Sequence, residues 1–246
     1  MREINLIITS SLKNNLRNNV VIIVALATIL ICAIGMVAAI GILAIAPEVK
    51  REIINLHNLK SMLCLSVYGS CLVGLGINMN VFAFQTMTHE KSRGNITALL
   101  ATPLEVSHIW SGKSLAVFLP GLVMGVVLGL ISLLAINYIY FVPVTGFLFN
   151  AWIAVSGFLA LPLVYLSLSF LVHNIGLTGK PATGNIIVQI FLPFFATLMI
   201  NLGMRGVLDA ASWPFALVNL GVAAAIGIIA FWLKPRLTRE RIVLSG

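Results

Sequence analysis

The stretch QTMTHEKSRGNITALLATPLEVSHIWSGK, residues 85–113, is the longest polar-bearing interruption between the apolar runs of this chain. Glu90 and Arg93 lie in its polar first part, Gly94 follows them, and residues 96–101 form a short apolar segment. An apolar segment of this kind favours a short helix. The stretch therefore predicts an ordered surface rather than a plain linker.

A second helix start follows within the same stretch. Thr102 can act as an N-cap, Pro103 suits the first helical turn, and Glu105 stands three residues after the cap. The order of helix, break and new helix is typical of a docking surface.

The composition of the chain is that of an integral membrane protein. Of its 246 residues, 60% are hydrophobic and 9% are charged, and the mean hydropathy is +1.07. A soluble domain carries roughly 25% charged residues. The charge-free stretches are residues 18–47, 61–88, 114–179, 181–204 and 210–233. A spanning helix needs about 20 apolar residues, so the longest stretch holds two spans and each of the others holds one.

These stretches predict an all-α integral membrane protein with six transmembrane helices in a single domain, residues 1–246. Apolar residues recur every fourth position at the amino terminus, which predicts an amphipathic helix at the membrane interface over residues 3–19. The predicted spans are residues 20–46, 61–84, 109–137, 147–171, 184–202 and 213–233, and residues 85–108 form the loop between spans two and three. Whether part of residues 194–211 re-enters the membrane stays open.

The basic residues predict the orientation. The chain has 15 lysine and arginine residues and a net charge of +8. If both termini are cytoplasmic, only Lys50, Arg51, Lys60 and Arg205 fall outside, in agreement with the excess of basic residues in cytoplasmic loops. We therefore expect a multi-pass protein of the plasma or inner membrane, and we do not interpret the charge as a nucleic-acid site.

Two patterns within the spans concern helix faces. Gly121, Gly125 and Gly129 repeat a small-residue spacing that lets another helix approach closely, so we interpret them as packing positions. Span five carries a row of polar residues spaced at multiples of four, and these are Asn185, Gln189, Thr197 and Asn201. Such a row is costly in lipid unless it faces protein or water. It indicates either the wall of an aqueous pathway or hydrogen bonds to a neighbouring helix.

The search for catalytic chemistry gives mostly negative results. The sequence has no metalloprotease or serine-hydrolase motif and no predicted metal site, and its acidic residues, Glu3, Glu48, Glu52, Glu90, Glu105, Asp209 and Glu240, lie outside the predicted hydrocarbon core. Residues 111–114 end like a phosphate-binding loop, but Ser107 stands where the first glycine should be. We therefore expect no catalytic residue and no bound cofactor, and we interpret Lys113 as an anchor of span three on the cytoplasmic side.

The quoted stretch also resembles a known family. Glu90–Asn95, Leu99–Leu104 and Gly112–Lys113 are similar to the loop between spans two and three of ABC-2-type permeases, the membrane subunits of ATP-binding cassette exporters. The count of six spans, the two cytoplasmic termini and the amphipathic helix before span one are similar as well.

The resemblance implies a type V exporter-like permease fold and a function in efflux. Two such chains, identical or paralogous, would form the translocation pathway, with Asn185, Gln189, Thr197 and Asn201 along it. ATPase subunits, which bind ATP and Mg, would dock on the loop. The implied coupling residues are Glu90, Arg93, Gly94, Leu99, Leu100, Thr102 and Pro103. The substrate stays open, and lipids, amphiphilic drugs and peptides are all compatible. The alternative is a membrane scaffold subunit of a biogenesis complex that transports nothing.

Overall fold

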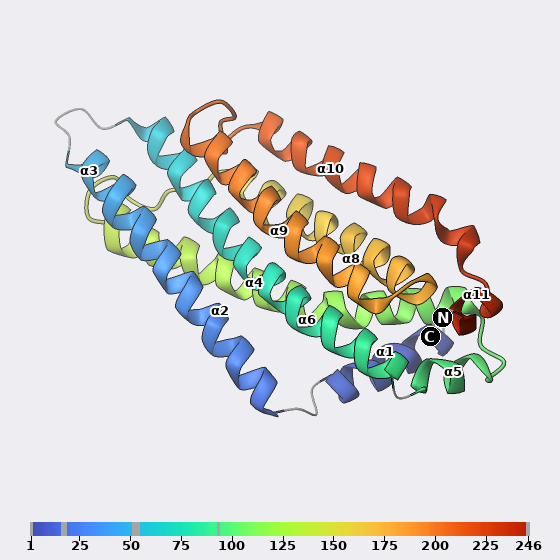
Figure 1. Cartoon of the computed structure of the whole chain (residues 1–246). Coiled ribbons are helices and arrows are strands. Elements are labelled where there is room, and N and C mark those ends of the chain that lie inside the picture. Colours follow the sequence, from blue (N-terminus) through green and yellow to red (C-terminus); the bar gives the residue numbers. More distant parts are fainter. Residues whose placement is uncertain (1, 16–18, 51–54, 93, 245–246) are drawn as a thin grey trace.

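A computed structural model describes residues 2–15, 19–50, 55–92 and 94–244 of the chain. All regular elements in these residues are helical, and six helices are long and apolar enough to cross a membrane. The chain is therefore a multi-pass α-helical membrane protein. The spans run side by side, and the short helices α1 (Arg2–Asn15), α5 (Asn95–Leu100) and α11 (Arg239–Leu244) gather with both termini at one end (Figure 1). We call this the loop end.

The long helices follow from the charge-free stretches, in which most residues are apolar. The remaining elements in chain order are α2 (Asn19–Ile40), the π-helix η1 (Gly41–Ile45), α3 (Ala46–Val49), α4 (Leu56–Ser92), α6 (Val106–Ile136), the π-helix η2 (Asn137–Phe141), α7 (Ala151–Ile153), the π-helix η3 (Ala154–Ala160), α8 (Leu161–Thr178), α9 (Pro181–Met204), α10 (Trp213–Trp232) and the 3-10 helix η4 (Lys234–Arg236).

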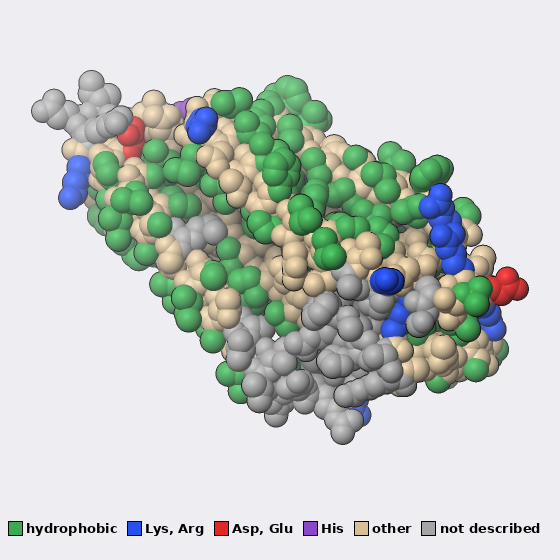
Figure 2. Space-filling view, in the orientation of Figure 1, with side chains coloured by type: hydrophobic (Ala, Val, Ile, Leu, Met, Phe, Trp, Pro, Cys, Tyr) green, Lys and Arg blue, Asp and Glu red, His purple; other side chains and the backbone are tan. Residues whose placement is uncertain are grey.

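Helix α4 is the central element of the bundle. Of its most apolar window, 89% is buried, against 24% for the first span and 28% each for the spans of α9 and α10. It packs against α2, α6, α8 and α9. Apolar side chains cover much of the outer surface of the bundle (Figure 2), which is the exposure that a lipid-facing surface requires. The outer helices therefore surround α4 and present their other sides to the membrane.

The glycine row of α6 lies at its contact with α4. A Cβ atom added at Gly125 would lie 3.1 Å from the backbone oxygen of Cys71, and one added at Gly74 would lie 2.8 Å from Cα of Gly125. Gly121 faces Asn78, and Gly129 faces Cys71 and the ring of Phe158. Side chains at these positions would separate the two helices that form the centre of the bundle.

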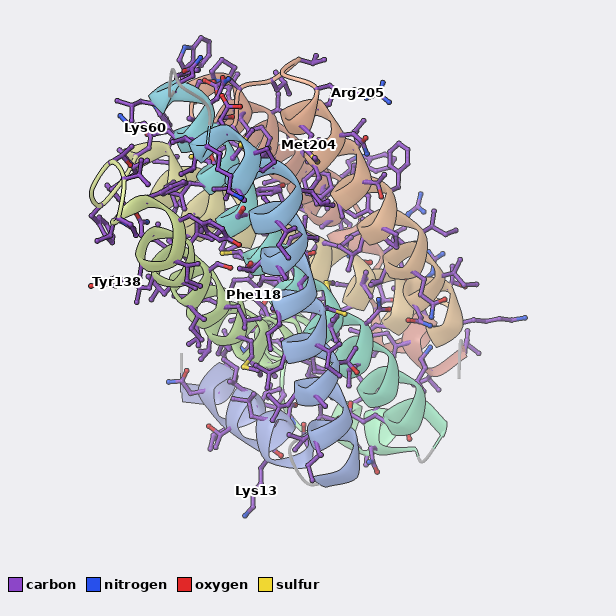
Figure 3. All side chains as sticks on the ribbon, turned by 90° about the vertical axis from the view of Figure 1, so that its left-hand side faces the viewer. Lys13, Lys60, Phe118, Tyr138, Met204 and Arg205 are labelled. Carbon is purple, nitrogen blue, oxygen red and sulfur yellow. The ribbon has the colours of Figure 1, made fainter. Side chains whose placement is uncertain are left out.

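Two of the loops bear on the predictions from hydropathy, and the first of them differs from its prediction. Helix α4 continues to Ser92, although the predicted second span ends at residue 84. Helix α9 runs without interruption to Met204, and α10 begins at Trp213 after a segment of turns and bends. Residues 205–212 thus contain no re-entrant helix in the structure. Met204 and Arg205 lie with Lys60 at the end of the bundle opposite Lys13 (Figure 3), and we call this the far end.

Helix α1 packs against the beginning of α6. Ile7 is 5% exposed, and a Cβ atom at Gly112 would lie 2.7 Å from its Cγ2 atom. Leu6, on another side of the helix, is 65% exposed. The amphipathic helix thus has one apolar side against the protein and another directed outward.

Candidate functional site

The candidate site is the loop end, where the stretch of residues 85–113 turns between α4 and α6. Gly94 makes the turn possible because its φ is +71°, a conformation that glycine adopts without strain. Its amide donates to the carbonyl of Lys91, at 3.1 Å, and its own carbonyl accepts from the hydroxyl of Thr97, at 2.6 Å. Helix α5 therefore begins directly after the turn, at Asn95.

A buried ion pair joins the end of α4 to the beginning of α6. Lys113 Nζ donates to Glu90 Oε2, and each side chain is 9% exposed. The side chain of Lys113, interpreted above as an anchor of span three, thus turns its ammonium group inward to the carboxylate of Glu90. Next to Glu90, Lys91 Nζ donates to the carbonyl of Gly179 at 2.6 Å, and burial lowers the pKa of Lys91. These contacts hold α4, α6 and the end of α8 in one arrangement.

The predicted N-cap at Thr102 is wrong. The Thr102 hydroxyl donates backward to the carbonyl of Leu99, at 2.6 Å, at the end of α5. Helix α6 begins at Val106 after Glu105, which makes no side-chain cap hydrogen bond. The last carbonyls of a helix lack partners within it, so the hydroxyl satisfies the end of the preceding helix instead of the start of the next.

Leu100 is 5% exposed and belongs to an apolar cluster that we call the loop-end core. The buried members of the loop-end core are Ile7, Ile96, Leu100, Ile109, Trp110, Leu177 and Ile242. Leu99 is half-buried against it. Because Leu100 points into the core, it supports α5 from inside. The small side chains of Thr97, Ala98, Ala101 and Pro103 are exposed on α5 and the following turn.

A pocket of about 550 Å³ opens between α1 and α5. Its lining includes Leu6 and Ser10 from α1, Leu99 from α5, and the Glu90–Lys113 pair. Of the sequence-predicted coupling residues, Glu90, Gly94, Leu99, Leu100, Thr102 and Pro103 thus come together at the loop end. Arg93 lies outside the described residues.

The predicted polar row of span five lies on α9. Gln189, Thr197 and Asn201 are exposed, and Asn185 is half-buried. The Asn201 side-chain amide donates to the carbonyl of Thr197, at 2.8 Å, within its own helix. Gln189, Thr197 and Asn201 therefore face out of the single chain, away from the other helices of the same bundle.

Sequence reasoning missed several polar contacts inside the bundle. The Tyr68 hydroxyl donates to Asn219 Oδ1 at 2.7 Å, which joins α4 to α10, and the hydroxyls of Ser70 and Ser132 lie 2.5 Å apart between α4 and α6. Isolated polar residues in the apolar runs were a signal for these contacts. The contact of Arg239 with the turn after α5, described below, had no such signal.

Among the residues that the structure describes, no group of three or more histidine, cysteine, aspartate or glutamate side chains could hold a metal ion. No family model, curated protein or solved structure matches this chain.

Proposed function

We propose that this chain is the permease subunit of an ATP-binding cassette exporter of the ABC-2 type, with its loop end as the docking site for an ATPase subunit. The resemblance of residues 85–113 to that family is the starting point. The observation that carries the proposal is the construction of the loop end, where the short helix α5 rests on a core and is flanked by the buried Glu90–Lys113 pair.

This construction suits the transfer of force. The exposed side of α5 and of its C-cap residue carries small side chains, Ala98 and Ala101, so a partner can approach the backbone closely. A push on α5 would reach α6 through Leu100 and Trp110 in the loop-end core. It would reach the central helix α4 through the short turn at Gly94. The helices that a partner would move are thus those that pack most closely in the bundle.

The charge distribution supports a cytoplasmic loop end. Lys180, Lys234, Arg236, Arg239 and Arg241 are exposed at this end, and Figure 2 shows several lysine and arginine side chains there. Basic residues near the ends of spans favour the cytoplasmic side, where ATP is available.

The polar row of α9 supports a pathway formed by two copies. Amide side chains such as Gln189 and Asn201 are costly against lipid, and in the single chain they face outward. A second copy, with water between the two rows, gives them polar surroundings.

The test begins with purification of the tagged chain from its source membrane and identification of an ATPase that co-purifies and carries cassette-type nucleotide motifs. Thr97→Arg and Ala101→Arg place a long cation on the exposed side of α5. Val207→Arg, at a residue that is 66% exposed at the far end, is the matched control. The proposal predicts that only the first two variants lose the ATPase and the ATP turnover of the complex in nanodiscs. Equal retention in all three variants contradicts it, and loss of a biogenesis complex without any ATPase would favour the scaffold alternative.

A further inference from the structure

The segment after the last span forms a helix that returns to the loop end. Residues 239–244 form α11, and the Thr238 hydroxyl accepts a hydrogen bond from the Arg241 amide at 3.3 Å, as an N-cap does. Lys234 and Arg236 precede it, and the guanidinium of Arg236 lies 5.8 Å from the centre of the Trp232 ring. The tail therefore has two parts, a basic part beside the end of α10 and a helical part beyond it.

Arg239 bonds directly to the turn between α5 and α6. Its Nη2 atom donates to the carbonyl of Leu104 at 2.8 Å and to that of Thr102 at 3.3 Å. Thr102 and Leu104 belong to no helix, so their carbonyls lack the repeated partners that a helix supplies. A planar guanidinium, with several donors in a fixed arrangement, suits two neighbouring carbonyls.

Ile242 provides a second attachment one turn later. It is 2% exposed and belongs to the loop-end core together with Leu100 and Leu177. Val243 and Leu244 are 52% and 86% exposed, so the burial of Ile242 is specific to one side of α11. The helix is thus fixed to the core on this side and to the turn through Arg239.

We infer that α11 is a positioning element for the loop end, with Arg239 as the residue that fixes the turn of residues 101–105 and thereby the exposed side of α5. The part of the inference that concerns an ATPase rests on the proposed function. The part that concerns the turn does not, because it is a property of the chain alone. The segment of residues 234–244 therefore positions the exposed side of α5, in addition to any effect of its basic residues on the membrane orientation.

The first measurement is hydrogen–deuterium exchange on the purified chain in nanodiscs. Arg239→Ala is expected to raise exchange of residues 95–105 by about tenfold or more, since the turn loses hydrogen bonds from a charged donor. Arg241→Ala removes the same charge from the same helix at an exposed position and is expected to leave this exchange unchanged. Arg239→Lys, which keeps the charge but not the planar group, should give an intermediate value. Unchanged exchange in the middle of α8 and α10 checks that each variant is folded.

The second measurement uses the complex with the co-purified ATPase. Arg239→Ala should lower the ATP turnover of the complex several-fold more than Arg241→Ala does, with partial recovery in Arg239→Lys. The inference is overturned if Arg239→Ala and Arg241→Ala give the same exchange in residues 95–105. It is also overturned if Arg239→Ala unfolds the spans while Arg239→Lys leaves the turn as protected as in the unaltered chain. If the exchange result holds and no ATPase binds, the proposed function fails and the positioning role stands.

Discussion

The buried ion pair between Glu90 and Lys113 allows a quantitative prediction. Each side chain is 9% exposed, so removal of one leaves the other charge buried without its partner. Loss of one member of a buried pair costs about 3–5 kcal/mol, whereas replacement of both members by apolar residues of similar size is often neutral or stabilising. The free energy of unfolding should therefore respond to the two single changes and much less to the double change.

The variants are Glu90→Leu, Lys113→Met and their combination, measured by thermal unfolding in one detergent. Tryptophan fluorescence is a suitable signal because Trp110 is 1% exposed in the adjacent loop-end core. We expect each single variant to unfold about 6–20 °C lower, from about 2–4 °C per kcal/mol for chains of this length. The double variant should recover most of that loss, which gives a coupling energy of about 3 kcal/mol or more.

The reasoning is refuted if the two single losses simply add in the double variant, because the side chains would then act independently. It is also refuted if each single variant lies within about 0.5 kcal/mol of the unaltered chain, the usual range for surface substitutions. A useful control is Lys234→Met, which removes an exposed lysine at the same end and should have little effect.

Three further predictions concern the bundle. Tyr68→Phe leaves a buried amide oxygen without its donor, so thermal unfolding should show a loss of about 1–3 kcal/mol, and no loss would contradict the role of this hydrogen bond. Gly125→Val should separate α4 from α6 and lower the free energy of unfolding by about 1–3 kcal/mol or more. Gly221→Val, at a position with open space around it, should lower it little in the same assay, and equal losses in the two variants would refute the packing argument. In a chain whose native cysteines are replaced, a cysteine at position 189 should crosslink two copies in membranes more efficiently than a cysteine at the exposed position 190. The reverse order would argue against a shared pathway on this side of α9.

The six spans could be predicted because each depends on a local property, a run of residues without charge. The length of α4 could not be predicted in this way. Its continuation to Ser92 depends on the contacts of Glu90 with Lys113 in α6 and of Lys91 with the carbonyl of Gly179. Hydropathy ends a span where polar residues begin, but a helix ends where its backbone turns, and here that is Gly94.

The candidate site was predicted in location more than in detail. The sequence pattern indicated the turn and the short helix, but not which side of α5 would face inward. Leu100, one of the implied coupling residues, lies in the loop-end core. The contact of Arg239 with Leu104 spans 135 positions in the chain. No local pattern at either residue encodes it, because it arises only when α10 brings the tail back to the loop end.

The most direct test of the central claim is site-specific photo-crosslinking in the membrane. A photoreactive residue at Ala101, on the exposed side of α5, should form a covalent product with a cassette-type ATPase, and one at Val207 at the far end should not. The product at Ala101 should diminish under conditions that dissociate the ATPase from this chain. If Ala101 gives no ATPase product while the ATPase co-purifies, or if Val207 gives the same product, the loop end is not the docking site.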